Sequence, residues 1–460
     1  MQTELALVTV NAPRRRVDVA LPVHVPLADL LAELLSHAGE GLADDGERHG
    51  GWVLRRAGGA ALDSGQTLQT QGVRDGTVLH LVPARVAWPE LEYDDVVEAI
   101  ADGARRRGAA WSGADTLATA LVVAGTVLAA ALVVLLRAGP GSAATAVCTA
   151  AVAAGLTVAG IVVARVLRQR AAGVALGAFS LPYAFVTGAL LTADGGPVGP
   201  VPGLRWVGAP ELLLGSAGLT LQGVLGIVGV GAGRRVFAAA VLTGLVSAVT
   251  AVGGLGLSAV GCAAVLAAGL VCGVGVLPVL AIRLGRLPIP PVTLPAGEST
   301  DRPDRDRVFA AVARTEELLG GMLIGHAVLV AAACAVLVGG GGFWGRVLAG
   351  VCGAALLLRA RVFVTARHRV PLLAGGVAVM AMVGLAVAWR PSGTLPMVVA
   401  AVGLVSALVI AAAGVAYRSR PAGPYLGRAA DLLDTTLALA VVPVACAVLG
   451  LYAHARALID

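Results

Sequence analysis

The chain contains no lysine, and all 34 of its basic residues are arginine. Acidic residues are scarce over most of its length: 17 of the 28 Asp and Glu side chains occur within the first 115 residues, and the remaining 345 residues carry 11. A soluble domain needs charge over its whole water-facing surface, so this distribution excludes a soluble globular protein. It indicates a polar N-terminal domain followed by a polytopic membrane region.

Residue patterns for catalysis and metal binding are also lacking. No apolar segment carries Asp or Glu in its interior, and His326 is the only ionisable side chain, apart from thiols, well inside one. A packing role is favoured for His326 over a proton relay. The sequence has no Gly-rich phosphate loop, metalloprotease helix or nucleophile elbow. We therefore predict no enzymatic activity, no cofactor and no metal.

The six cysteines all lie in apolar segments and lack the spacing of metal ligands. They are expected to act as small hydrophobic side chains. They are Cys148, Cys262, Cys272, Cys334, Cys352 and Cys446.

Long apolar segments dominate the rest of the chain. Mean hydropathy is +0.85, with 57% apolar and 13% charged residues. Because the hydrocarbon core of a bilayer is about 30 Å thick, a spanning helix needs roughly 20 apolar residues. The sequence predicts eleven such spans, at 116–136, 142–163, 171–192, 212–230, 236–255, 258–282, 319–338, 347–366, 371–388, 395–416 and 432–451. The Gly-rich fourth and fifth have the least distinct bounds.

Arginine placement predicts the orientation. No signal peptide is recognisable at the N-terminus, so the N-terminal domain is expected to stay cytoplasmic. If the N-terminal domain is cytoplasmic, the cytoplasmic flanks of the spans carry 21 arginines and the outer flanks carry 5. This distribution follows the positive-inside rule. An odd number of spans then puts the C-terminus outside. The net charge of +6 is thus a topology signal, and nucleic-acid binding is not expected.

The N-terminal domain, 1–84, reads as strand, strand, helix, strand, strand. Residues 5–10 and 17–21 alternate as strands, 27–35 repeat apolar residues with helical spacing, and 52–56 and 79–81 are strand-like again. This is the order of a ubiquitin-like β-grasp domain (α+β). The chain continues past the last strand without a Gly-Gly end and has no lysine, which excludes conjugation and favours binding or scaffolding.

Two further segments suit protein contacts. In the linker, 85–115, an amphipathic helix is predicted over 91–107, with Val96, Val97 and Ile100 on its apolar side; it is either a solvated connector or a docking helix. The cytoplasmic loop, 283–318, is Pro-rich and then charged, and a helix is predicted from Val308 into the seventh span. It is either a folded linker or a partner-contact element.

Small residues recur at helical spacing in the membrane region. The pairs are Gly173 and Gly177, Gly269 and Gly273, and Gly321 and Gly325. Such pairs let helix backbones approach closely. Packing within the chain is favoured for each pair, and use between subunits stays open.

The segments RRRVDVALPVHVPLADLLAELLSHAGE, GWVLRRAGG, GVRDGTVLHLVPAR, DDVVEAIAD and DRVFAAVARTEELLGGML, with the predicted architecture, resemble the EccD family. EccD is the polytopic membrane component of the actinobacterial type VII (ESX) secretion system. The resemblance covers essentially the full length. It implies an all-α membrane domain of about 11 helices, 116–460, behind the ubiquitin-like domain.

The resemblance implies a structural role. EccD-like proteins form dimers whose helices enclose a lipid-facing vestibule, and they contact the FtsK/SpoIIIE-type ATPase EccC alongside EccB and EccE. The complex exports WXG100/Esx-type proteins, and the ATPase supplies the energy. The expected partner-contact residues are Arg14, Arg15, Arg16, Arg55, Arg56, Val96, Val97, Ile100, Arg302, Arg305 and Arg307.

A multi-span permease with a regulatory ubiquitin-like domain is the alternative. It would need polar groups or broken helices near the bilayer midplane, and Pro182, Pro278 and Pro443 are the candidate break points. Prolines in membrane helices are usually structural, which disfavours this alternative. An enzyme acting on lipids is disfavoured further, because nucleophile, metal cluster and paired carboxylates are missing.

Overall fold

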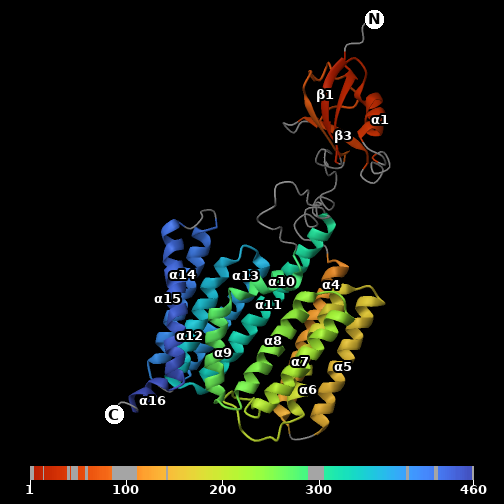
Figure 1. Cartoon of the computed structure of the whole chain (residues 1–460). Coiled ribbons are helices and arrows are strands. Elements are labelled where there is room, and N and C mark those ends of the chain that lie inside the picture. Colours follow the sequence, from red (N-terminus) through yellow and green to blue (C-terminus); the bar gives the residue numbers. More distant parts are fainter. Residues whose placement is uncertain are drawn as a thin grey trace, which may run out of the picture. The chain divides into compact units, whose positions relative to one another are not determined.

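The computed structural model describes residues 5–13, 15–38, 42, 50–56, 61–84, 111–140, 143–287, 305–389, 393–418 and 423–457. The chain divides into two compact units, Met1–Trp111 and Ser112–Asp460, which are described separately (Figure 1).

The first unit is built on a four-stranded sheet. Its strands are β1 (Leu5–Asn11), β2 (Arg16–Pro22), β3 (Trp52–Arg56) and β4 (Val78–Pro83), in the order β2-β1-β4-β3. Strand β1 pairs antiparallel with β2 and parallel with β4, and β3 pairs antiparallel with β4. With helix α1 (Leu27–Ala38) between β2 and β3, the predicted order is confirmed.

One face of this sheet carries the core. Alternation along β1 buries Val8 and Val10, and the helical stripe of α1 buries Leu30 and Leu34 in the same cluster. The indole of Trp52 donates a 2.7 Å hydrogen bond to the carbonyl of Leu42. The unit therefore has a hydrophobic core of its own.

The second unit is all-helical. Its elements are α4 (Gly113–Ala138), α5 (Ala143–Arg165), α6 (Arg170–Leu190), α7 (Ala209–Gly229), α8 (Arg234–Gly253), α9 (Ala259–Gly273), α10 (Val276–Gly285), α11 (Arg305–Gly340), α12 (Gly342–Arg359), the 3₁₀ turn η2 (Ala360–Val362), α13 (Ala366–Ala388), α14 (Leu395–Ala416), α15 (Pro424–Val448) and α16 (Leu451–Ala457). Ten helices within the described residues are long and apolar enough to cross a membrane, or 11 if the bent pair α9 and α10 counts as one span. The predicted membrane architecture is confirmed.

The fourth and fifth predicted spans are separate helices, α7 and α8. The turn between them contains Gly231 and Gly233, whose φ angles are +68° and +63°. Residues other than glycine rarely adopt this left-handed conformation. The two glycines therefore let the chain reverse within four residues.

The sixth predicted span, 258–282, is divided into α9 and α10, which are bent by 71°. Gly273 and Gly275 flank the break, and Pro278 has no N–H to donate to the carbonyl of Val274. Helix α9 has 15 residues and is about 22 Å long, which is short of a bilayer core. The predicted sixth span is therefore a broken one, and its break lies next to Pro278, one of the candidate break points.

Helix α11 runs through the middle of the second unit, packed against α8, α9, α10, α12 and α13. It has 36 residues and is about 54 Å long, so it exceeds a bilayer core by several turns. The predicted helix entering the seventh span is its N-terminal part. Its buried residues include His326, which is 2% exposed.

Two of the three small-residue pairs pack helices within the chain. A Cβ on Gly173 would lie 2.6 Å from the carbonyl oxygen of Gly160 in α5, and one on Gly321 would lie 2.5 Å from that of Arg235 in α8. At Gly269 and Gly273 a Cβ would meet nothing within 4 Å, so the expectation of packing within the chain is wrong for that pair.

Candidate interaction site

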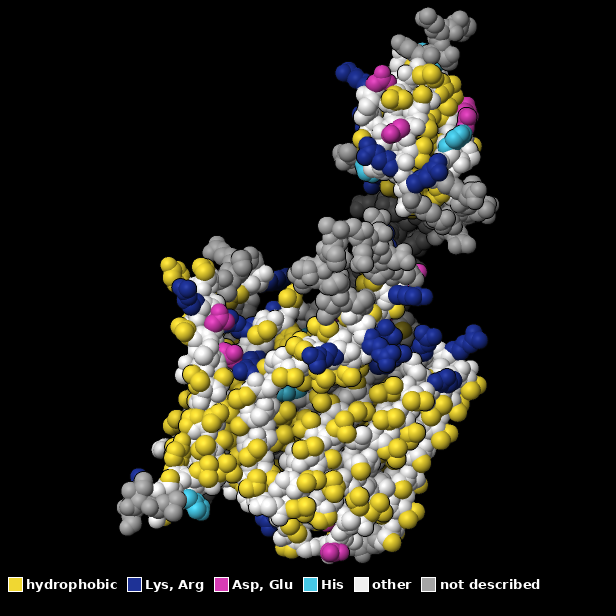
Figure 2. All heavy atoms as spheres, in the orientation of Figure 1, with side chains coloured by type: hydrophobic (Ala, Val, Ile, Leu, Met, Phe, Trp, Pro, Cys, Tyr) yellow, Lys and Arg dark blue, Asp and Glu magenta, His cyan; other side chains and the backbone are white. Residues whose placement is uncertain are grey.

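Arginines gather at one end of the second unit. Because successive helices run in opposite directions, the C-terminus of α5, the N-termini of α6, α8 and α13, and the first half of α11 meet there. Figure 2 shows these side chains above a broad apolar belt. We call this the arginine end, defined by Arg165, Arg170, Arg234, Arg235, Arg314, Arg359, Arg361 and Arg367.

Some of these arginines bind helix carbonyls or carboxylates. Arg165 donates from Nε to the carbonyl of Gly229 at 2.5 Å and from Nη2 to that of Val228 at 2.7 Å. Both carbonyls belong to the last turn of α7, where intrahelical donors run out. Arg165 therefore fastens the end of α5 to the end of α7.

Arg359 likewise fastens helix ends together, at the break between α9 and α10. Its Nη1 donates to the carbonyl of Val271 in the last turn of α9, and its Nε lies 3.2 Å from Asp434 of α15. Arg361 pairs with Asp431 at 2.5 Å in a more exposed position. The break leaves carbonyls without partners, and Arg359 supplies a charged donor to one of them.

Two cavities, of about 460 and 520 Å³, adjoin at the arginine end and share Gly233, Ala313 and Glu317. Their charged lining comes from four elements: the starts of α6 and α8, the N-terminal half of α11 and the start of α13. It consists of Arg170, Arg234, Arg235, Arg314, Glu316, Glu317 and Arg367. With five arginines against two glutamates, this lining is suited to binding an anionic group.

Comparison with known proteins decides the family. The family model described as the EccD-like transmembrane domain matches residues 116–458. The chain belongs to the EccD family. A second family model, protein YukD of the WXG100 protein secretion system, matches residues 5–81, which agrees with the ubiquitin-like prediction for the N-terminal domain.

Curated EccD proteins align with the chain from end to end. The ESX-4 secretion system protein eccD4 of Mycobacterium tuberculosis is 28% identical over 471 residues, covering 98% of this chain and 97% of the relative. The ESX-3 secretion system protein EccD3 of the same species is 28% identical over 494 residues, covering 98% of each.

Solved structures share the EccD fold. A chain in protomer 1 of the ESX-3 core complex has a TM-score of 0.55 and 22% identity, covering 98% of this chain and 100% of that one. A chain in the ESX-5 inner membrane complex has a TM-score of 0.54 and 22% identity, covering 90% and 100%.

The partner-contact residues expected from the EccD resemblance do not form one surface. Arg15 and Arg16 lie at the edge strand β2, whereas Arg55 and Arg56 lie on β3, the opposite edge of the sheet. Arg15 donates to the carbonyl of His37. The two pairs therefore present two separate basic edges.

Other expected contacts divide between described and undescribed segments. Arg305 and Arg307 are exposed in the first turn of α11. The predicted helix over 91–107 and the remaining expected residues lie outside the described part of the chain. These are Arg14, Val96, Val97, Ile100 and Arg302.

A buried polar cluster in the EccD-like domain was missed in the sequence. The Nε2 of Gln222 in α7 donates to the hydroxyl of Ser180 in α6 at 2.7 Å and to that of Thr157 in α5. The single Gln within the apolar stretch GLTLQGVLG is the signal that could have revealed it. Because the amide donates to both hydroxyls, the cluster joins three helices.

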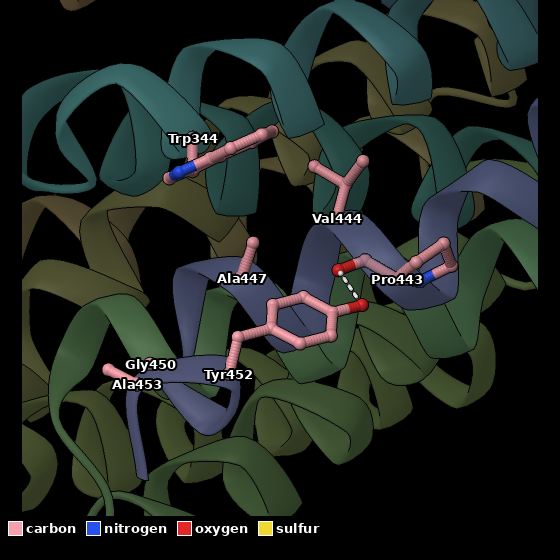
Figure 3. A pocket seen from close by; sticks show the side chains of 7 residues that line it. All are labelled: Trp344, Pro443, Val444, Ala447, Gly450, Tyr452 and Ala453. Carbon is pink, nitrogen blue, oxygen red and sulfur yellow. Dashed lines mark hydrogen bonds between the residues drawn. The ribbon is translucent and has the colours of Figure 1, made fainter. Parts of the chain in front are cut away.

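A third cavity, of about 490 Å³, lies away from the arginine end, where α12 begins and α15 ends (Figure 3). The hydroxyl of Tyr452 donates to the carbonyl of Pro443 at 3.2 Å, and the ring of Trp344 faces it across the cavity. Trp and Tyr favour the boundary between hydrocarbon and water, so this cavity marks the opposite membrane boundary.

Proposed function

We propose that this chain is a non-catalytic membrane component of a type VII (ESX) secretion complex in the cytoplasmic membrane. The observation that carries the proposal is the EccD-like transmembrane domain over residues 116–458, joined to a YukD-like domain over 5–81. The curated relatives are ESX secretion system proteins. The similar solved chains come from ESX membrane complexes.

The orientation follows from arginine placement. The arginine end faces the cytoplasm, because positive charge is retained on that side of a membrane. The ubiquitin-like domain (1–84), the linker (85–115) and the loop (283–318) share this side, and the C-terminus is outside. In this orientation α11 extends its charged first half toward the cytoplasm.

The cytoplasmic elements dock the EccC-type FtsK/SpoIIIE ATPase, which drives export of WXG100/Esx-type proteins. Arg305 and Arg307 support this role, because they are exposed at the start of the long helix α11, with Arg302 shortly before them. Guanidinium groups pair with carboxylates in two-pronged geometry and suit such a contact. EccB- and EccE-like proteins complete the complex.

The membrane domain pairs with a second copy. Helices α4 and α14 support this, because neither buries a residue of its apolar window inside the chain. The apolar faces of these two helices therefore contact lipid and the partner subunit.

Reversing Arg302, Arg305 and Arg307 to Glu tests the docking role. The triple variant is expected to recover several-fold less ATPase when the tagged chain is purified from native membranes in mild detergent, with bound proteins quantified by mass spectrometry. Insertion is expected to persist, because the inner flanks still hold most of the arginines.

The matched control reverses three arginines at the opposite end, Arg137, Arg346 and Arg456, and should retain the ATPase. Unchanged ATPase recovery with the first variant would contradict the docking role. If the unmodified chain were purified without any secretion component bound to it, the permease alternative would be favoured.

A further inference from the structure

Among the described residues, five arginines around the two adjoining cavities have no polar partner. Arg170, Arg234, Arg235, Arg314 and Arg367 line these cavities, and within the described part of the chain none of them forms an ion pair or a hydrogen bond. Their neighbours at the arginine end are engaged in capping or pairing contacts. The five guanidiniums are therefore available to a ligand.

The cavity lining has a clear charge imbalance. Two carboxylates, Glu316 and Glu317, face the five guanidiniums, which leaves an excess of three positive charges. His368 is occupied, because its Nδ1 lies 2.7 Å from the hydroxyl of Thr365. The imbalance selects for an anion.

Backbone donors add to this preference. Helix α6 begins at Arg170 behind Gln169, and α8 begins at Arg234 behind Gly233; neither receives a side-chain cap. The first N–H groups of both helices therefore lack side-chain acceptors and carry the positive end of the helix dipole. Helix N-termini of this kind bind phosphate groups.

The position of the cavities identifies the source of the anion. Arg170 and Arg234 open two apolar membrane helices and line one of the two cavities. Val174 and Val236, near the starts of the same helices, line the adjoining cavity. The site thus combines a cationic rim with an apolar wall at the boundary of the hydrocarbon core. A water-soluble anion would contact only the cationic rim. A phospholipid would contact the rim with its headgroup and the apolar wall with its acyl chains.

We propose that this site binds the phosphate headgroup of an anionic phospholipid of the cytoplasmic leaflet, with Arg170, Arg234 and Arg314 as its principal ligands. Planar guanidinium groups hold two phosphate oxygens at once. The lipid would wedge between α6, α8 and α11 and fasten their ends together. This binding is independent of ATPase docking and uses none of the arginines assigned to it.

The test is a binding titration of the purified full-length chain in neutral detergent with short-chain phosphatidylglycerol. Short-chain phosphatidylcholine and inorganic phosphate serve as comparison ligands. Each arginine at an anionic headgroup contributes about 1 kcal/mol, or about fivefold in affinity. R234Q/R314Q is therefore expected to weaken binding by roughly 25-fold, and R234K/R314K by much less.

The control R137Q/R456Q removes the same charge from the opposite end and should bind like the unmodified chain. Elution volume and thermal unfolding of every variant report on folding. Unchanged phosphatidylglycerol binding by a folded R234Q/R314Q variant would overturn the site. Equal binding of inorganic phosphate would overturn the lipid assignment.

Discussion

At the scale of single residues, arginine has distinct roles within a short distance. Arg165 and Arg359 donate to helix carbonyls, whereas the guanidiniums around the cavities form no ion pair or hydrogen bond with any described residue. The difference follows from where the chain leaves acceptors without donors. The end of α7 and the break between α9 and α10 supply such acceptors, and Arg165 and Arg359 donate to them.

The two ion pairs of α12 and its following turn allow a matched comparison. The side chains of Arg359 and Asp434 are 13% and 29% exposed, against 36% and 74% for Arg361 and Asp431. Arg359→Gln is expected to lower the free energy of unfolding by about 1.5–3 kcal/mol, since it leaves a sheltered carboxylate and a helix carbonyl unpaired. Arg361→Gln should cost less than about 1 kcal/mol.

Denaturant unfolding of both variants in detergent measures this difference. Adding Asp434→Asn to Arg359→Gln should restore part of the loss, because the unpaired carboxylate is then removed. Equal effects of the two single substitutions would show that burial does not set the strength of these pairs.

At the scale of elements, glycine decides how closely the helices approach. A Cβ on Gly188 of α6 would overlap the carbonyl of Leu214 in α7, whereas Gly269 of α9 faces open space. Tight contacts of this kind replace the hydrophobic effect, which does not drive helices together inside lipid. Glycine content alone does not reveal which positions make them.

Gly188→Ala is expected to destabilise the membrane domain by about 1–3 kcal/mol, because the added methyl group forces α6 and α7 apart. Gly269→Ala, which removes helix flexibility without a clash, should be neutral or stabilising by up to about 1 kcal/mol. Thermal unfolding followed by loss of the monodisperse elution peak measures both. A tolerated Gly188→Ala would mean that the α6–α7 approach is not tight in the membrane.

At the scale of the whole molecule, charge and hydropathy organise the chain into two units with different surroundings. The first unit closes its own core, and the second exposes an apolar belt beneath the arginine end (Figure 2). Orientation across the membrane is a property of the whole chain, because the inner and outer flanks are summed.

Single added cysteines test this orientation. Ala455→Cys in α16 should react with a membrane-impermeant maleimide in intact cells, because the C-terminus is predicted outside. Ser64→Cys in the first unit should react only after permeabilisation. The unmodified chain, with its six cysteines, is the background control. The reverse pattern would contradict the positive-inside assignment.

The sequence by itself determined the class of architecture. Strand alternation in the first unit and apolar runs in the second are local, periodic signals, so the β-grasp order and the helices α4 to α8 could be read from them. Topology was predicted in the same way, because arginine flanks can be counted without knowing any contact. The EccD resemblance rested on this combination.

Only the tertiary structure decided which residues meet. The break between α9 and α10, the Gln222 cluster and the cavities at the arginine end join residues from helices far apart in the chain. The separation of Arg16 from Arg55 likewise depends on sheet order. Periodicity reports the environment of a side chain but not its neighbour, because the pairing of helices and strands is set by the complementary shapes and hydrogen bonds of elements distant in sequence.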